Sequence, residues 1–434
     1  MSQLLESNKV AIIGAGPMGL AAAYEVLKLG FKPVIFEADD RVGGMTATFD
    51  FCGHSIERYY HFHCTSDDDF FKFLNEVGLD KHLNWKPTKM SYWYQGRLQS
   101  WGDPISLLKF KGLSLVAKIR YGFHAFVCTK RKNWKPLEKY DAKTWLYKRV
   151  GKKAYDVLWR NLFELKFYHH TENLSSPWIW SRIRRIGNSR YNVFKEKLGY
   201  LKGGSQTLLN GFTDYIEKNG GIINLSSPVS RVLFSEDNSV CGVISKGEEH
   251  RFDKVISTIP LPFVPKLMPD LPKSLLSAYS SKENIAAICV IVKLRKKLTD
   301  SFWVNTNDPE MDIPGIIEYG NLNDDVGHIV YVPYYMPQTD PKFQDSDFVF
   351  EQKVRRYFKK VNPGLEDADF IDVKVNRYKY AQPICTPNFL EELPDYKTPI
   401  NGLFIADTSH YYPEDRGISE SIGFGRKLAS EMLN

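Results

Sequence analysis

Hydrophobic and polar positions change their spacing near the beginning of the chain. Residues 10–13 form a short apolar run, residues 21–29 are apolar at helical spacing with many small side chains, and residues 34–36 are apolar again. Short apolar runs on either side of an amphipathic stretch are typical of a strand, a helix and a second strand. The pattern therefore predicts a βαβ unit, which is the building block of a parallel sheet.

The middle of the chain contains longer patterned segments. Apolar and polar residues alternate on both sides of Gln95-Gly96, which predicts a hairpin over residues 91–101. The predicted helices are 104–127, 142–150, 152–163 and 347–360, and the predicted strands are 284–294, 329–335 and 370–380. Helices and strands are mixed along these segments, which indicates a second α/β unit.

Glycines mark the turn of the first unit. Gly14, Gly16 and Gly19 give the spacing GxGxxG between the first strand and the helix, and Glu37 follows the second strand. In dinucleotide-binding folds such glycines permit a tight turn, close approach of a pyrophosphate and packing of helix on strand, while the acid binds ribose hydroxyls. All four residues occur in this order, so we expect a dinucleotide site.

The residues after Glu37 favour FAD. They read ADDRVGG, in which Arg41, Gly43 and Gly44 form a second phosphate-approach turn. This arrangement resembles the FAD-binding superfamily of flavin amine oxidases, protoporphyrinogen oxidase and phytoene desaturases, which also includes UDP-galactopyranose mutase. The resemblance implies a Rossmann-like domain that binds FAD non-covalently. Met45 departs from it, because the superfamily usually has a basic residue there.

Two later segments carry the same resemblance. Residues 202–232 read as a Gly-Gly turn, a helix and two strands, and the resemblance implies that Val229 presents its backbone to adenine. The last segment reads as a strand ending at Asp407, a loop, and a helix beginning near Gly417. In the superfamily such an acid lies near the ribityl chain or pyrophosphate, and such a helix points its N-terminus at the flavin. The alternative for Asp407 is a cap of a turn or helix.

We therefore expect an α/β fold with a Rossmann-like FAD-binding domain and a discontinuous, mixed α/β substrate domain. Residues 1–90, 198–260 and 385–434 are assigned to the FAD-binding domain, and residues 91–197 and 261–384 to the substrate domain. The chain has 434 residues and 43% hydrophobic content, which is enough for two packed cores.

The stretch ERYYHFH contains two histidines, His61 and His63, that would face the same side of a strand. No third His or acid stands at a useful spacing, so we expect no metal site there. Either the histidines fill a core or pack on FAD, or one of Tyr60, His61 and His63 faces the flavin and exchanges a proton near neutral pH. Tyr380 is a further candidate, because RYKYAQPI resembles the aromatic strand that borders the flavin; cross-strand packing is its alternative.

The resemblance implies an oxidoreductase in which hydride moves between flavin N5 and a C–N or C–C bond. The region around ERYYHFH also resembles UDP-galactopyranose mutase, so the first alternative is a reaction of reduced FAD on a nucleotide sugar without net redox change. A second alternative is a flavin-bound membrane or partner module without catalysis. No second GxGxxG is present for NAD(P)H.

The net charge of +7 is unevenly distributed. Residues 109–135 contain eight Lys/Arg and no acid, and residues 178–202 contain seven Lys/Arg and one Glu, mixed with large apolar side chains. Such stretches are typical of helices on anionic membranes or of solvated basic faces. We expect peripheral membrane contact and an apolar, lipid-linked or glycan-related substrate. Nucleic acid is not expected as a partner, because no nucleic-acid-binding motif is present.

The six cysteines are scattered and show no CxxC spacing. They indicate neither a disulfide framework nor a cysteine zinc site, which fits a reducing cytoplasm. The first residues are polar rather than signal-like, and no apolar run approaches the ~18 residues of a membrane span. We expect a cytoplasmic protein with peripheral membrane contact.

Overall fold

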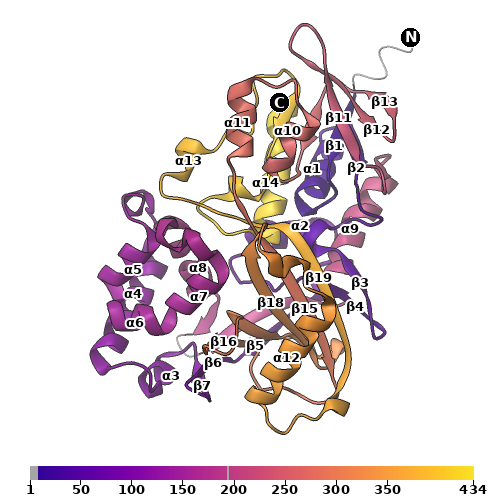
Figure 1. Cartoon of the computed structure of the whole chain (residues 1–434). Coiled ribbons are helices and arrows are strands. Elements are labelled where there is room, and N and C mark those ends of the chain that lie inside the picture. Colours follow the sequence, from indigo (N-terminus) through magenta and orange to yellow (C-terminus); the bar gives the residue numbers. More distant parts are fainter. Residues whose placement is uncertain (1–7, 193–194) are drawn as a thin grey trace.

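The computed structural model describes residues 8–192 and 195–434 (Figure 1). Three groups of elements meet in it: a parallel sheet with its helices at the top, a helical group at the lower left, and a large mixed sheet at the lower right. Helices and strands are both present in the N-terminal, middle and C-terminal parts of the described chain, although α3 to α8 follow one another without a strand. The predicted α/β class is confirmed.

The parallel sheet has five strands in the order β10-β2-β1-β14-β20. Its strands are β1 (Lys9–Ile13), β2 (Lys32–Phe36), β10 (Ile222–Asn224), β14 (Val255–Ser257) and β20 (Leu403–Ile405). Val10, Ala11 and Ile12 are completely buried, as expected for a parallel strand that is covered on both faces. Segments from the two ends and the middle of the chain thus form one sheet.

Both faces of the parallel sheet are covered by other elements. One face packs against α1 (Pro17–Lys28), α2 (Asp68–Glu76), α9 (Ser205–Lys218) and α14 (Ile418–Leu433). The other packs against β11 (Val229–Phe234), β12 (Val240–Ser245), α10 (Val264–Leu267) and α11 (Lys273–Ser280). β13 (Glu248–Arg251) completes the small sheet β11-β12-β13.

The mixed sheet has seven strands in the order β19-β15-β18-β17-β16-β6-β7. Its strands are β6 (Met90–Tyr94), β7 (Arg97–Trp101), β15 (Asn284–Leu294), β16 (Trp303–Asn307), β17 (Gly315–Glu318), β18 (Ile329–Pro337) and β19 (Phe370–Pro383). Alternate residues of β15, including Ile288 and Val290, pack beneath α12 (Asp347–Val361). The residues between them, including Ala287 and Cys289, face the rest of the molecule.

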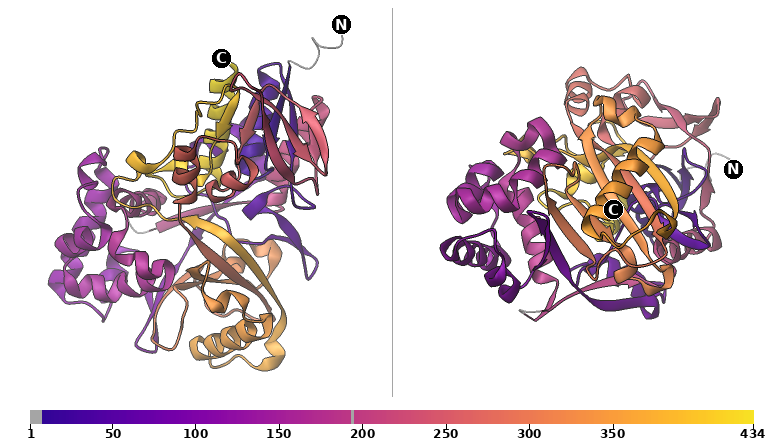
Figure 2. Two further views of the ribbon diagram at one scale, coloured as in Figure 1. Left: turned by 45° about the horizontal axis from the view of Figure 1, so that its top comes forward. Right: turned by 60° about the horizontal axis from the view of Figure 1, so that its bottom comes forward.

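The helical group lies beside the mixed sheet in both views of Figure 2. It comprises α3 (Pro104–Lys109), α4 (Leu115–Lys130), α5 (Ala142–Val150), α6 (Lys152–Leu158), α7 (Arg160–Phe167) and α8 (Ser176–Asn188). The remaining elements are β3 (Thr48–Phe51), β4 (His54–Glu57), β5 (Leu83–Thr88), β8 (Arg190–Asn192), β9 (Lys195–Leu201) and α13 (Phe389–Glu392). β5, β8 and β9 form a small sheet that joins the groups.

Two predicted helices were wrong in extent. The predicted helix 104–127 is interrupted between α3 and α4, because Phe110 turns into the core and each half begins at its own cap. Asp103 accepts hydrogen bonds from Ile105 and Ser106, and Ser114 accepts one from Ala117. The predicted helix 152–163 is likewise interrupted at Trp159, where φ is −122°.

The predicted substrate segments meet in the mixed sheet, where β6 pairs in parallel with β16. α10 and α11 follow β14 and pack in the same core as β11 and β12. The domain boundaries themselves stay a prediction.

Candidate functional site

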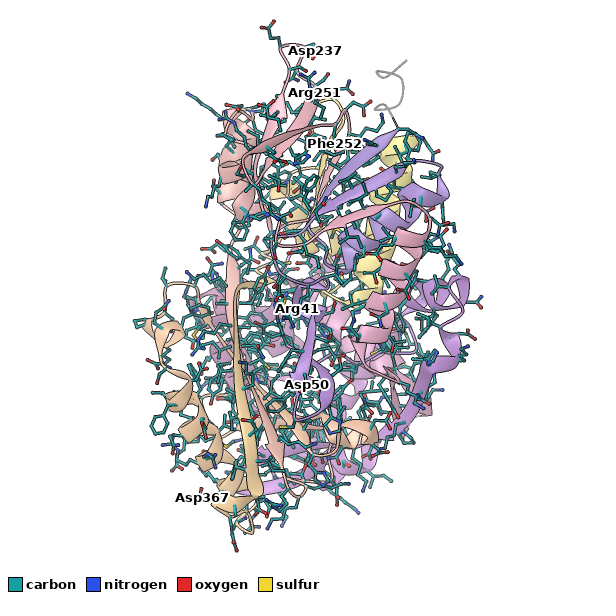
Figure 3. The ribbon with its side chains drawn as sticks, turned by 90° about the vertical axis from the view of Figure 1, so that its right-hand side faces the viewer. Arg41, Asp50, Asp237, Arg251, Phe252 and Asp367 are labelled. Carbon is teal, nitrogen blue, oxygen red and sulfur yellow. The ribbon has the colours of Figure 1, made fainter. Side chains whose placement is uncertain are left out.

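A cavity of about 2050 Å³ lies where the three groups meet. The carboxyl ends of β1 and β2 form one wall, and Cys289 and Tyr335 of the mixed sheet form part of another. Figure 3 shows Arg41, which lines this cavity, near the middle of the molecule. Ordinary ligand pockets extend to about 1,000 Å³, so this space accommodates a dinucleotide together with a second ligand.

The first glycine turn gives the cavity a wall of bare backbone. Gly14 has φ +100°, and a Cβ atom there would lie 2.9 Å from Oγ1 of Thr258. Gly16 is the N-cap of α1, and a Cβ atom there would meet nothing within 4 Å. The first turn of α1 contains no acidic residue, so its positive end is available to an anion.

Gly19 does not line the cavity and has a packing role. A Cβ atom on Gly19 would lie 2.0 Å from the carbonyl oxygen of Gly14, so α1 rests directly on the turn. This contact is the close helix-on-turn packing expected of the third glycine in the motif.

The second glycine turn abuts the first. The N–H of Gly43 donates to the carbonyl oxygen of Ala15 at 2.8 Å. A Cβ atom on Gly44 would lie 3.4 Å from Cα of Gly16. Gly44 and Met45 line the cavity, whereas Gly43 lies behind them and joins the two turns.

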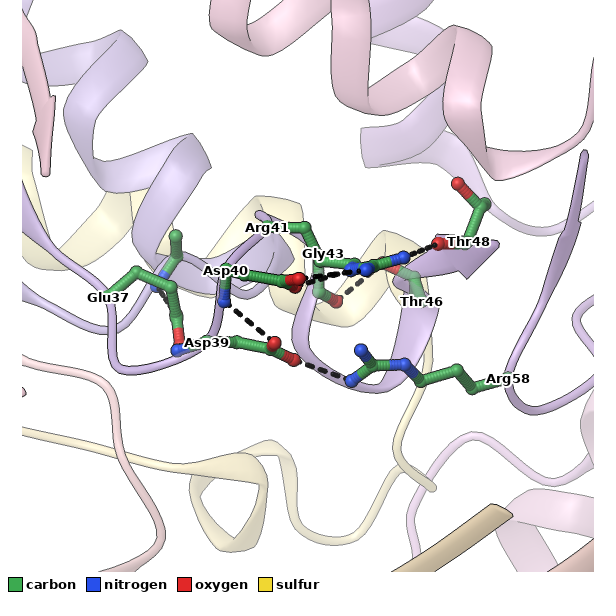
Figure 4. A network of polar contacts seen from close by, with 9 residues as sticks. Glu37, Asp39, Asp40, Arg41, Gly43, Thr46, Thr48 and Arg58 are labelled. Atoms are coloured by element: carbon green, nitrogen blue, oxygen red, sulfur yellow. Dashed lines mark hydrogen bonds and ion pairs between the residues drawn. The ribbon is translucent and has the colours of Figure 1, made fainter. Parts of the chain in front are cut away.

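Glu37 links the end of β2 to the first turn (Figure 4). Its Oε2 atom accepts a hydrogen bond from the N–H of Ala15 at 2.6 Å, and its Oε1 atom accepts one from the N–H of Asp39 at 2.8 Å. Glu37 also lines the cavity. A carboxylate has about four lone-pair positions, so these two bonds leave capacity for ribose hydroxyls.

Two guanidinium groups flank the glycine turns (Figure 4). Arg41 donates from Nε to Asp40 at 2.7 Å and from Nη1 to the carbonyl oxygen of Thr48 at 3.1 Å. Arg58 donates from Nη1 to Asp39 at 2.5 Å. Both arginines line the cavity. Bare backbone, a helix N-terminus, an acid and two guanidinium groups together fit the pyrophosphate and ribose of a dinucleotide.

The other predicted cofactor residues also line the cavity. Val229 lies at the start of β11, and Gly417 is the N-cap of α14. Asp407 accepts hydrogen bonds from Leu261 at 3.0 Å and Ser409 at 2.8 Å, so it caps a turn as well as facing the cavity. Burial alone would raise the pKa of Asp407, but His410 and these amides lower it below its usual value.

His61 and His63 lie in an irregular segment, so the predicted strand was wrong here. His63 forms a single β-bridge, in which its N–H donates to Gly199 at 2.8 Å, and its imidazole stacks on Phe70 at 3.7 Å. His61 also lines the cavity, and its Nδ1 atom is buried without a hydrogen-bond partner in the described chain. Burial, His63 and Arg416 lower the pKa of His61 to about 3.

Tyr380 lies on β19 and faces the cavity, where its ring centre is 4.4 Å from that of Phe263. Its neighbour Tyr378 also lines the cavity, and burial raises the pKa of Tyr378 to about 12. The predicted aromatic border on this strand thus lies at the cavity wall. Phe263 lies in the 3-10 helix Leu261–Phe263 and not on a strand, so this ring contact is not the cross-strand packing given as the alternative, and the role of Tyr380 stays a prediction.

Sequence reasoning missed several basic residues in the cavity wall, among them Lys166, Arg182 and Arg416. Arg182 belongs to the segment WIWSRIRR, which was interpreted as a surface helix. The available signal was spacing, because Arg182 stands four residues after Trp178 and its guanidinium lies 4.4 Å from that ring. Lys166 and Arg416 had no local signal.

A group of potential metal ligands is present away from the cavity. Ligand atoms of His169, His170 and Glu283 lie within 4.8 Å of one another, and none of the three residues lines the cavity. His170 is 3.3 Å from Glu283, which is an ordinary ion-pair distance. No motif or spacing in the sequence connects these residues.

Comparison with known proteins identifies the family. Residues 19–426 match the family of flavin containing amine oxidoreductases. The chain belongs to this family. The superfamily and the enzyme class expected from the motifs are thereby confirmed: the protein is a flavin-dependent oxidoreductase.

Individual relatives are distant in sequence and similar in fold. A 15-cis-phytoene desaturase from Synechococcus elongatus is 20% identical over 435 residues, which cover 92% of this chain and 90% of the desaturase. Cyclohexylamine oxidase from Brevibacterium oxydans superposes with a TM-score of 0.70 at 14% identity, over 98% of this chain and 99% of the oxidase. A reduced UDP-galactopyranose mutase superposes with a TM-score of 0.74 at 16% identity, over 98% of this chain and 94% of the mutase.

Proposed function

We propose that this oxidoreductase binds FAD non-covalently and moves hydride between flavin N5 and a C–N or C–C bond of an apolar, lipid-linked or glycan-related substrate. The supporting observation is that one cavity joins the glycine turns to a largely apolar wall contributed by the mixed sheet and the helical group. The cofactor residues Gly14, Gly16, Glu37 and Arg41 lie at one part of this cavity.

When bound, FAD supplies the hydride acceptor or donor, and the protein positions the substrate and handles protons. His61 is suited to orienting a ligand, because its low pKa keeps the imidazole neutral at pH 7 with Nδ1 unpartnered. Burial raises the pKa of Tyr60 well above its usual value, so its phenol remains protonated and able to donate.

The first experiment is the visible spectrum of the purified protein before and after denaturation and filtration. Oxidised-flavin bands that pass into the filtrate as FAD would support non-covalent binding. A protein that is colourless and fails to take up added FAD would overturn the proposal. Flavin that stays with the precipitated chain would overturn only the non-covalent part.

The catalytic part of the proposal is tested by His61→Ala and His63→Ala. We expect turnover to fall at least tenfold in His61→Ala with FAD content unchanged. Unchanged turnover in both variants with normal FAD content would remove the histidines from the reaction.

A mutase-like reaction is the second candidate, supported by the fold similarity to reduced UDP-galactopyranose mutase. It predicts activity only after prereduction of the flavin and only with a nucleotide sugar. Turnover that consumes an electron acceptor would decide against it.

We also propose that α3 and α4 contact a membrane. Seven of the fourteen exposed large apolar side chains of the described residues lie on these two helices: Ile105, Leu108, Leu115, Val116, Ile119, Phe123 and Phe126, with exposures of 51% to 68%. Lys109, Lys111, Lys130 and Lys132 are exposed nearby. Apolar side chains mixed with lysines fit an anionic lipid surface.

The cavity wall reaches this surface. Phe126 is 59% exposed and also lines the cavity, as do Leu107 and Tyr121. An apolar substrate could therefore enter from a lipid surface. None of the helices among the described residues is long and apolar enough to cross a membrane.

The part of the second basic stretch that lies on α8 does not extend this surface. On α8, Trp178 and Trp180 are buried, and Arg182 and Arg185 pair with Asp415 and Asp67. The proposal of membrane contact is therefore limited to α3 and α4.

Vesicle flotation tests the contact. We expect the protein to float with vesicles that contain phosphatidylglycerol and to float less with pure phosphatidylcholine. Val116→Ser/Phe123→Ser should abolish flotation, whereas Phe348→Ser, at an equally exposed phenylalanine on α12, should leave it unchanged. Equal flotation of both variants would exclude this face as the contact.

A further inference from the structure

Three cations from separate elements meet in the substrate side of the cavity. Lys166 comes from α7, Arg182 from α8, and Arg416 immediately precedes the N-cap of α14. The Nζ atom of Lys166 lies 4.8 Å from the ring centre of Tyr335 on β18. We refer to Lys166, Arg182 and Arg416 as the basic cluster.

The basic cluster has one acidic partner in the described chain. Nη2 of Arg182 lies 2.8 Å from Oδ1 of Asp415, and it also contacts Oε1 of Gln382 at 3.2 Å. Neither Lys166 nor Arg416 forms an ion pair with any described residue. The neighbouring Arg185 is already paired with Asp67 at 3.2 Å. The two guanidinium groups of Arg182 and Arg416 therefore face one carboxylate, that of Asp415, and the cluster carries more positive than negative charge whether or not Lys166 is protonated.

Donor atoms of the cluster are also unpartnered. Nε of Arg182 and Nη1 of Arg416 are buried, and no described residue accepts a hydrogen bond from either. A buried charged donor without an acceptor is costly, and a guanidinium is shaped to bind an oxyanion through two parallel hydrogen bonds. These two atoms indicate where acceptor oxygens would lie.

The two guanidinium groups of the cluster affect the titration of Lys166. Burial lowers the pKa of Lys166 well below its usual value, and Arg182 and Arg416 lower it further, against an opposing effect of Asp415. A negative group placed among the cations would offset their mutual repulsion.

We infer that the basic cluster binds an oxyanion, a carboxylate or a phosphate, on the substrate. The inference rests on the proposed function and adds the substrate class: an amphiphile with an acidic group and an apolar body. Trp159, the N-cap residue of α7, Leu162, on the same helix as Lys166, and Tyr335, whose ring Lys166 contacts, also line the cavity and suit the apolar body. The N-terminus of the 16-residue α14 adds a favourable dipole beside Arg416.

The test uses the flavin-loaded protein and isothermal titration calorimetry with three matched probes: decanoate, decyl phosphate and decanol. We expect at least one anionic probe to bind at least tenfold more tightly than decanol. Preference for decanoate or for decyl phosphate identifies the acidic group as carboxylate or phosphate.

Variants locate the binding site. Lys166→Met and Arg416→Gln should each weaken the binding of the anionic probe at least tenfold and leave the binding of decanol unchanged. Two control variants should retain anion binding. Lys153→Met changes an exposed lysine on α6, and Arg184→Gln changes an arginine on α8 that pairs with Glu414 and does not line the cavity.

Three results would overturn the inference. The first is binding of all three probes with equal affinity, and the second is anion binding that both cluster variants retain. The third is a lower flavin midpoint potential in Arg416→Gln with unchanged anion affinity, which would assign the charge to the reduced flavin. Flavin content is measured on the same sample, so absence of flavin, which contradicts the proposed function, is distinguished from absence of anion binding.

Discussion

The Nδ1 atom of His63 lies 3.6 Å from the Oδ2 atom of Asp67, and both side chains are almost completely buried. Asp67 also accepts hydrogen bonds from Arg185 at 3.2 Å and from the N–H of Cys64 at 3.0 Å. Burial would raise the pKa of Asp67, but His63 and Arg185 lower it below its usual value. The carboxylate of Asp67, which is the N-cap residue of α2, thus connects His63 to Arg185 on α8.

The contacts of Asp67 predict that its substitution strongly destabilises the protein. Asp67→Asn leaves Arg185 buried without its counter-ion, so we expect the free energy of unfolding to fall by about 3 kcal/mol. Urea unfolding measures the change. Asp68→Asn, at the next and exposed position, should change stability by less than about 0.5 kcal/mol. Equal effects of the two substitutions would show that Arg185 does not depend on Asp67.

Glu37 provides a test of the cofactor site. In Glu37→Gln the amide nitrogen must face the N–H of Ala15 or of Asp39, so one of these hydrogen bonds is lost. We expect FAD to bind at least tenfold more weakly, which corresponds to about 1.4 kcal/mol. Titration of the flavin-free protein with FAD measures this. Asp50→Asn, at an exposed position of β3, is the control. Unchanged affinity would exclude Glu37 from the site.

Two glycine-to-alanine substitutions should act in opposite directions. Gly19→Ala places a methyl group 2.0 Å from a backbone oxygen that cannot move aside, and we expect a loss of at least about 3 kcal/mol. In Gly122→Ala the methyl group would lie 3.6 Å from Leu107, and α4 should gain up to about 1 kcal/mol. Thermal unfolding distinguishes them, and a stable Gly19→Ala would contradict the close packing of α1.

Glu196 predicts a pH-dependent stability. Burial raises its pKa from 4.5 to about 7, so the stability contributed by its protonated form is complete below about pH 4.5 and is lost as the pH rises through about 7. Glu196→Gln does not ionise. We therefore expect this variant to gain about 2 kcal/mol over the native protein between pH 5 and pH 8.

Urea unfolding at the two pH values measures this difference. Glu248→Gln makes the same chemical change at an exposed position and serves as the control. A difference in the free energy of unfolding between Glu196→Gln and the native protein that stays constant across this pH range would refute the prediction.

The nucleotide end of the fold could be predicted because its determinants are local. Gly14, Gly16 and Gly19 belong to one turn and one helix, and Glu37 reaches back to that turn from the adjacent strand. The interruption after α3 was also encoded locally, in the caps Asp103 and Ser114, but the apolar spacing of 104–127 concealed it.

The basic cluster could not be predicted in the same way. Lys166 and Arg416 are separated by most of the substrate segments, and only tertiary packing places both in one cavity wall. The partner of a charged side chain decides its role, and partners distant in sequence are not visible in local periodicity. Arg182 and Arg185 look alike in WIWSRIRR, yet they pair with Asp415 and Asp67 respectively.

The order β10-β2-β1-β14-β20 has a consequence for biosynthesis. Residues 9–13 leave the ribosome long before residues 403–405, which complete their sheet, and α14 packs on α1 only afterwards. During synthesis the early βαβ unit must persist with one sheet edge and one helix face uncovered, which favours association with chaperones. Cofactor loading is consequently a late event, so a nascent chain arrested before residue 403 should not retain FAD.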